Sequence, residues 1–216
     1  PYPCAQNKIC VSLKPGAPVH KGDKIKIAQL SGALDTAGVM QISAQGGGIN
    51  RTVTSTRKAS KQELISLGRE RLSQASTYGT TTIEAKSGYG LSVDSEIKLL
   101  EASSELTNNI CNVLPTWLGA HDCPKDKSKQ EYMEELINVQ LPIVCENNLA
   151  KWVDVFCEPG WFNLEETESI VNAAKELGLK SRLHVDEFVD SNGLNLAAEL
   201  GSASADHVGF SNSDSR

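Results

Sequence analysis

The chain has 216 residues, of which 39% are hydrophobic and 22% are charged, and its formal net charge is −6. This composition is typical of a globular protein with one core of moderate size. The acidic balance argues against nucleic acid as a partner, because proteins that bind a phosphate backbone normally carry a basic patch. No run approaches the roughly 18 apolar residues of a membrane span, and the first residues lack an apolar signal-peptide core. We therefore expect a cytoplasmic protein that binds neither nucleic acid nor a membrane.

The six cysteines are scattered and form no C-x-x-C pair; they are residues 4, 10, 111, 123, 145 and 157. The pattern predicts neither a zinc ribbon nor a disulfide framework. We expect most of them to be reduced thiols that pack as small apolar groups.

The first 45 residues differ in character from the rest, with weak indications of structure at 24–27 and 39–42. From about residue 60 onward, helix and strand patterns alternate. Ser60 and Glu63 have the spacing of a capping box, as do Asn163 and Glu166, and Ser92 is placed to cap another helix. The helices expected are 60–78, one beginning after Ser92, 131–139 with a break at Pro142 and a continuation to about 149, 163–178 and 194–200.

Short apolar or β-branched runs predict the strands, at 80–85, 113–120, 152–157, 182–185 and 203–207. Their ends lie 21 to 37 residues apart, a distance that suits β-α crossovers in a parallel sheet. Five strands do not close a barrel, which normally takes about 250 residues. The prediction is an α/β protein: part of a (β/α)8 TIM barrel over residues 46–216, preceded by a divergent segment over residues 1–45.

Three of the four histidines lie at the ends of predicted strands. His121 comes directly after the predicted strand 113–120, whereas His184 and His207 lie in the last residues of the predicted strands 182–185 and 203–207. Titratable groups at successive strand ends are how a parallel barrel builds a catalytic site. Taken singly, such a histidine is more often a hydrogen-bonded structural residue than a ligand.

Several motifs together make the sequence similar to the imidazolonepropionases of the metal-dependent amidohydrolase superfamily. Glu84-Ala85-Lys86-Ser87-Gly88-Tyr89-Gly90-Leu91 resembles that family's E-x-K-S-G-Y-G-L signature. The other motifs lie in the family's order over about residues 42–210: Gly46-Gly47-Gly48-Ile49, Leu118-Gly119-Ala120-His121, Val153-Asp154-Val155-Phe156-Cys157-Glu158, His184-Val185-Asp186-Glu187 and Ser204-Ala205-Asp206-His207.

The resemblance implies a hydrolase of histidine degradation that opens the ring of 4-imidazolone-5-propanoate to give N-formimidoyl-L-glutamate. It implies His184 as a ligand of one zinc or iron ion, and Glu187 and His207 as the catalytic groups. Tyr89, His121 and Lys24 match substrate-binding positions, and family members are commonly homodimers. The chemistry suits these residue types, because a metal ion lowers the pKa of bound water and a carboxylate or imidazole can carry the proton.

The sequence also departs from the family pattern. It contains no His-x-His pair, and Pro15 and Ala17 stand where the family has two metal ligands. Lys24 stands where the family has an arginine, which keeps the charge but loses the bidentate fork. The family's last ligand, an aspartate of the eighth strand, would lie after Arg216. Only His184 therefore matches a ligand, whereas catalytic zinc sites generally use three.

Two alternatives to an imidazolonepropionase remain open. One is a different amidohydrolase that acts on another cyclic amide or amidine, such as a deaminase. The other is a non-catalytic remnant that lacks the metal centre. Glu187 as a solvated loop carboxylate and Tyr89 as a packing residue would both fit this second alternative. All these interpretations place Asp154 and Glu158 in structural roles.

Overall fold

A computed structural model of the chain describes residues 48–106 and 111–214. The expected elements at 24–27 and 39–42, the positions of Pro15 and Ala17, and the substrate-binding position Lys24 lie outside the described residues.

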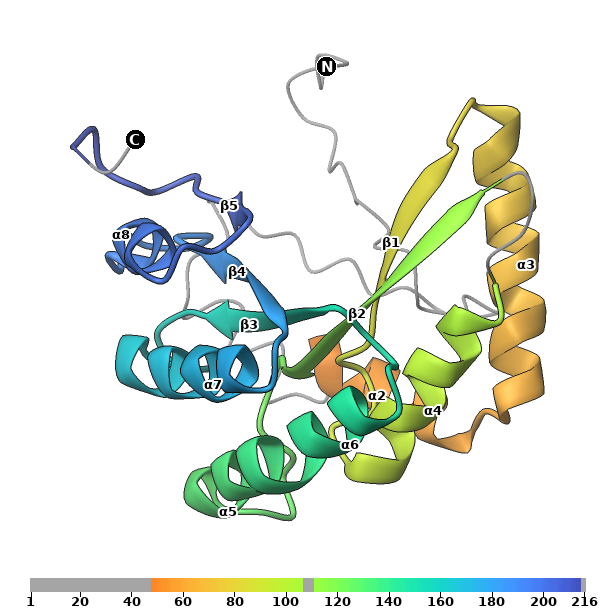
Figure 1. Ribbon diagram of the computed structural model, residues 1–216, viewed down its shortest axis with the longest axis horizontal. Coiled ribbons are helices and arrows are strands. Elements are labelled where there is room, and N and C mark those ends of the chain that lie inside the picture. The colour runs from red at the N-terminus through yellow and green to blue at the C-terminus, as the bar shows by residue number, and fades with distance from the viewer. Residues whose placement is uncertain (1–47, 107–110, 215–216) are drawn as a thin grey trace, which may run out of the picture. The chain divides into compact units, whose positions relative to one another are not determined.

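The described part is a curled parallel sheet of five strands in the order β1-β2-β3-β4-β5, as Figure 1 shows. Each neighbouring pair is parallel, and the register between β2 and β3 shifts between Trp117 and Ala120. This arrangement confirms the predicted partial barrel. The strands are β1 (Thr82–Lys86), β2 (Asn112–Ala120), β3 (Trp152–Cys157), β4 (Lys180–Val185) and β5 (Ala205–His207).

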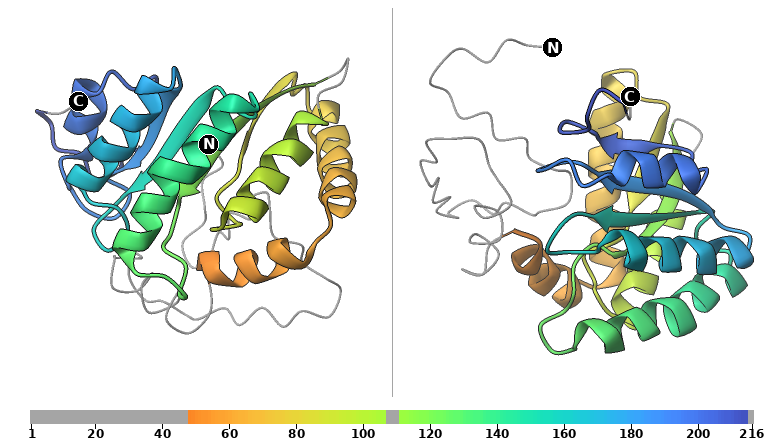
Figure 2. Two further views of the ribbon diagram at one scale, coloured as in Figure 1. Left: turned by 60° about the horizontal axis from the view of Figure 1, so that its bottom comes forward. Right: turned by 90° about the vertical axis from the view of Figure 1, so that its left-hand side faces the viewer.

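Helices α4 to α8 connect the strands, and together with α3, which precedes β1, they lie along one face of the sheet, as the two views of Figure 2 show. The helices are α2 (Gly48–Lys58), α3 (Lys61–Thr77), α4 (Val93–Ser104), α5 (Lys129–Glu135), the π-helix η1 (Leu136–Gln140), α6 (Leu141–Glu146), α7 (Leu164–Glu176) and α8 (Gly193–Glu199). In the described ranges, no helix is long and apolar enough to cross a membrane.

Two of the three predicted capping signals are confirmed. The capping boxes at Ser60 and Asn163 both form, with Glu63 and Glu166 as their partners. Ser92 is the N-cap residue of α4, but its side chain makes no capping hydrogen bond, contrary to the prediction. The backbone N–H groups ahead of this helix are satisfied by a different residue, Glu96, as described below.

The predicted break at Pro142 is wrong. Helices α5 and α6 are joined without interruption by η1, whose wider turn precedes the proline. Proline cannot donate to the carbonyl one turn back and its ring collides with that carbonyl, so a π-turn allows the helix to continue. Gln140 of this turn is fully buried and accepts a hydrogen bond from Trp117 Nε1 at 3.1 Å, which ties the turn to β2.

The core lies between the sheet and its helices. It contains side chains that are fully buried, among them Trp117, Tyr132, Leu136, Phe162 and Leu183. Because the helices cover this face, the opposite face of the sheet is left for polar side chains, and it is there that the site is built.

Candidate functional site at the C-terminal ends of the strands

Five of the residues singled out in the sequence lie in one continuous series of contacts at the C-terminal ends of the strands. Tyr89 and His121 have ring centroids 4.9 Å apart, and those of His184 and His207 are 5.2 Å apart. His207 Nε2 lies 3.4 Å from Glu187 Oε2. Phe156 of β3 joins the two halves, with its ring 5.7 Å from that of His121 and 6.1 Å from that of His184. The structure therefore brings these five residues together.

Tyr89 is presented by a loop that a buried carboxylate organises. Glu96 is fully buried in the first turn of α4 and accepts hydrogen bonds from the backbone N–H groups of Gly88, Gly90 and Leu91 at 2.6 to 2.8 Å. A Cβ on Gly90 would lie 2.7 Å from the backbone nitrogen of Glu96, so this close approach requires glycine. Burial raises the pKa of the Tyr89 hydroxyl, which keeps it a hydrogen-bond donor.

His121 is held by the same loop. Its Nδ1 lies 2.8 Å from the carbonyl oxygen of Gly88. A carbonyl can only accept, so Nδ1 carries the hydrogen in this arrangement. Arg57 of α2 also supports the loop, donating to the carbonyl oxygens of Gly90 at 2.6 Å and Leu91 at 2.8 Å.

Glu187 lies immediately after β4, where the chain turns. The strand ends at Val185, and Asp186 adopts a φ of +51°, so Glu187 is outside the regular alternation of the strand. The Asp186 carboxylate is fully buried and accepts from the backbone of Ser191 and Gly193 and from the Ser211 hydroxyl. These bonds fix the turn that carries Glu187.

A second buried carboxylate holds the backbone of Glu187 itself. Glu158 Oε1 accepts from the Glu187 N–H at 2.5 Å. Within the described part of the chain, Glu158 Oε2 is buried and has no hydrogen-bond partner. Burial raises the pKa of Glu158 to about 7, helped by the nearby charge of Glu187, and the backbone hydrogen bonds only partly oppose this.

A cluster of charged side chains crosses the open face of the sheet beneath these residues. Lys86 Nζ of β1 lies 2.7 Å from Asp154 Oδ2 of β3 and 2.8 Å from Asp206 Oδ2 of β5. Arg182 Nη1 of β4 lies 2.7 Å from Glu84 Oε1. Burial by itself would lower the pKa of Lys86, but the charge of Asp154 and the hydrogen bonds to Asp154 and Asp206 outweigh it and raise the pKa.

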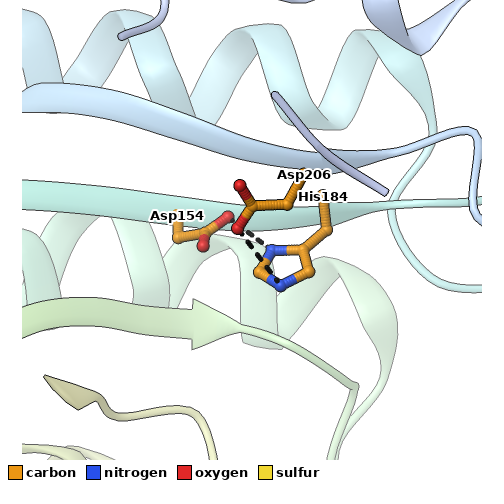
Figure 3. Close-up of side chains that lie close together, drawn as sticks. All are labelled: Asp154, His184 and Asp206. Carbon is orange, nitrogen blue, oxygen red and sulfur yellow. Dashed lines mark hydrogen bonds and ion pairs between the residues drawn. The ribbon is translucent and has the colours of Figure 1, made fainter. Parts of the chain in front are cut away.

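His184 stands between the two aspartates of this cluster, and Figure 3 shows both carboxylates next to its ring. Its Nδ1 lies 2.9 Å from Asp154 Oδ1, and its Nε2 lies 3.9 Å from Asp206 Oδ2. The pKa of Asp206 is lowered: burial works against this, but Lys86 and the two nearby histidines favour the charged form.

Asp154, His184 and Asp206 could hold a metal ion, since each offers one ligand atom and these atoms lie within 4.8 Å of one another. Imidazole nitrogen and carboxylate oxygen are suitable ligands for zinc or iron. The Lys86 ammonium already pairs with one oxygen of each aspartate. The donor that best fits a metal is therefore His184 Nε2, with Asp206 beside it.

Sequence reasoning missed Asp154, Asp206 and Lys86 as members of the site, and it missed Phe156 as the link between its halves. A signal for Asp154 was present: a carboxylate inside the apolar run Trp152–Cys157 is unusual, because acidic residues are almost never fully buried unless paired. Its partners come from β1 and β4, which a strand pattern does not reveal.

A curled parallel sheet that gathers histidines and carboxylates at the C-terminal ends of its strands is the architecture of the β/α-barrel proteins. Within that class, the chain is homologous to the imidazolonepropionases. It is 40% identical over 193 residues to an imidazolonepropionase of Alkaliphilus oremlandii, covering 88% of this chain and 45% of the relative.

Other relatives agree with this. The chain is 43% identical over 172 residues to an imidazolonepropionase of Thermoanaerobacter pseudethanolicus, covering 78% of the chain and 41% of the relative. It is 43% identical over 180 residues to one of Shewanella frigidimarina, covering 82% and 44%. The chain thus spans less than half the length of these curated relatives. No family model matches it.

Proposed function

We propose that this chain carries the substrate-side half of an imidazolonepropionase, a cytoplasmic hydrolase that opens the ring of 4-imidazolone-5-propanoate to N-formimidoyl-L-glutamate. The observation that carries the proposal is the contact series from Tyr89 and His121 through Phe156 to His184, His207 and Glu187. Homology to imidazolonepropionases supports it. In this proposal residues 46–216 form the partial barrel, and the complete protein is a homodimer, by analogy with the family.

The residues divide into two groups by chemistry. Tyr89 is a hydroxyl donor and His121 an imidazole whose Nδ1 is engaged by Gly88, so both suit hydrogen bonds to the substrate's carboxylate or carbonyl. Lys24 would add a positive charge for the carboxylate. Glu187 and His207, which face each other at 3.4 Å, are the pair that would take a proton from water and deliver it to the leaving ring nitrogen.

His184 would hold the zinc or iron ion through Nε2. Such an ion, when bound, supplies an activated water and polarises the substrate's carbonyl. The residues of this chain do the remaining work: the Phe156 ring packs against those of His121 and His184, and Glu158 holds the backbone of Glu187 in place.

The direct test is an assay of the purified chain, supplied with zinc or iron, on 4-imidazolone-5-propanoate. Product would be followed by mass spectrometry as N-formimidoyl-L-glutamate. We expect product formation that His207→Ala and Glu187→Gln each reduce by at least about 100-fold, the scale of a general acid-base group. Glu199→Gln, an exposed change at the end of α8, is the matched control and should leave the rate unchanged.

Two outcomes contradict the proposal in different ways. If the metal-loaded chain binds the substrate, as judged by perturbed Tyr89 and His121 signals in NMR spectra, but forms no product, hydrolysis by this chain is refuted and the alternative of a non-catalytic remnant holds. If it neither binds nor converts this substrate but deaminates or hydrolyses another cyclic amidine, the substrate assignment is wrong.

A further inference from the structure

The Lys86 ammonium is fixed by residues far apart in the sequence. It donates hydrogen bonds to Asp154, which is 68 positions away in the sequence, and to Asp206, which is 120 positions away. Glu84 Oε2 lies 3.6 Å from it. The Asp154 side chain is fully buried, so its charge needs a partner inside the protein. Lys86 provides that partner through Asp154 Oδ2, which leaves the other oxygen of this carboxylate for a different contact.

The other oxygen of Asp154 faces His184. Asp154 Oδ1 lies 2.9 Å from His184 Nδ1, a normal hydrogen-bond distance. An ionised carboxylate has no hydrogen to donate, so the hydrogen of this bond belongs to Nδ1. His184 Nε2 lies on the opposite edge of the ring, 3.9 Å from Asp206 Oδ2, which is beyond hydrogen-bond distance.

We propose that Lys86 and Asp154 are positioning residues that hold His184 in the tautomer with hydrogen on Nδ1, so that the Nε2 lone pair is directed to the metal. The metal role of His184 rests on the proposed function, but the tautomer does not. Asp154 then acts through His184 and is not itself a ligand, although its oxygen lies close enough to be one. Carboxylate partners of this kind orient histidine ligands in many metal sites.

The position of Lys86 favours Asp154 as a positioning residue over Asp154 as a metal ligand. With its ammonium 2.7 Å from Asp154 Oδ2 and 2.8 Å from Asp206 Oδ2, a dication between the three side chains would face a like charge at contact distance. An ion on the Nε2 side of His184 avoids this, since Asp154 lies on the Nδ1 side of the ring.

The experiment is ¹⁵N NMR of the metal-free chain labelled at histidine nitrogens, at a pH where the imidazoles are neutral. The His184 signals are identified by their loss in His184→Ala. We expect the wild-type ring to carry its hydrogen on Nδ1, Asp154→Asn to move most of the population to the Nε2 form, and Lys86→Met to give a mixture. Asp206→Asn is the matched control, because Asp206 also binds Lys86 but does not contact Nδ1, and it should keep the wild-type tautomer.

A wild-type ring with hydrogen on Nε2 would overturn the proposal by itself. The proposal can therefore be refuted even if a variant fails to fold. An unchanged tautomer in folded Asp154→Asn would overturn it as well. Zinc titration separates this inference from the proposed function. We expect Asp154→Asn to weaken zinc binding by about 10 to 100-fold. Equal zinc affinity of this variant and wild type would count against the positioning role of Asp154. A wild-type chain that binds no zinc contradicts the proposed function. In that case the tautomer of His184 still tests whether Lys86 and Asp154 position its ring.

Discussion

Replacing Glu158 by glutamine should change the pH dependence of stability in a predictable direction. Glu158 is 1% exposed, and one of its oxygens accepts the Glu187 N–H while the other is buried without a hydrogen-bond partner among the described residues. The side chain is therefore easier to keep as a neutral acid than as a carboxylate, and burial raises its pKa to about 7 from an ordinary value of 4.5. Glutamine is neutral at every pH and retains an oxygen for the Glu187 N–H.

The sign follows from the proton balance. In the unfolded chain Glu158 loses its proton near pH 4.5, whereas in the folded chain it keeps the proton until about pH 7. Between these values the folded state binds more protons, so stability falls as the pH rises through this window. The full penalty above pH 7 is about 3 kcal/mol, from a shift of roughly 2.5 pKa units at 1.36 kcal/mol each. Glu158→Gln removes this penalty and should gain stability relative to wild type as the pH increases.

Urea denaturation at pH 5 and pH 8 measures the effect. The free energy of unfolding of Glu158→Gln minus that of wild type should increase by about 2.5 kcal/mol between the two pH values. Any fixed cost of the extra amide group cancels in this comparison. Glu199→Gln, at an exposed position, serves as the control and should show no such increase. A difference between Glu158→Gln and wild type that is the same at both pH values would refute the reasoning.

Three further substitutions test other contacts by the same denaturation measurement. Glu96→Gln should cost about 2–3 kcal/mol, because a charged acceptor of three backbone N–H groups is lost, and a neutral result would contradict its role in the loop. Gly90→Ala should cost about 1–3 kcal/mol, since its Cβ would lie 2.7 Å from the Glu96 backbone nitrogen; an equally stable variant would refute this close packing. Lys86→Met should cost about 3–5 kcal/mol by leaving the buried Asp154 carboxylate without its ammonium partner, and adding Asp154→Leu should recover much of it.

The strands were predictable from sequence because many of their side chains are buried in the core. β3 runs over Trp152–Cys157 as predicted, and the other strands begin or end within two residues of the expected limits. β-Branched and apolar side chains on a covered sheet give a strong local signal. Helix starts with a capping box were equally local, because Ser60 and Asn163 bond to residues three positions later.

Helix α2 was not predicted because its stability comes from contacts that are distant in the sequence. It has no acidic residue in its first turn, and no capping signal marks its start. Lys98 of α4 donates to the carbonyl oxygens of Thr56, Arg57 and Ala59 at its C-terminal end. These bonds satisfy the last turn of the helix and join residues about 40 positions apart, which a local pattern cannot indicate.

The site was predicted in part for the same reason. Histidines at the C-terminal ends of strands mark an active-site edge, and His121, His184 and His207 were found in this way. Asp154 was assigned to structure because one carboxylate in a strand gives no indication of its partner. Only the folded, curled sheet brings Lys86 and His184 to the two carboxylate oxygens of Asp154.

Buried carboxylates at the C-terminal ends of the strands are engaged with the protein itself. Glu96 holds the loop of Tyr89, Asp186 holds the turn after β4, and Glu158 holds the backbone of Glu187. A group that faces a substrate must be kept in place by neighbours whose own positions are fixed. Glu187 is held in this way through its main chain, while its side chain faces His207. Substituting the supporting carboxylates should therefore act through the position of Glu187 and Tyr89, and substituting Glu187 should act on proton transfer alone.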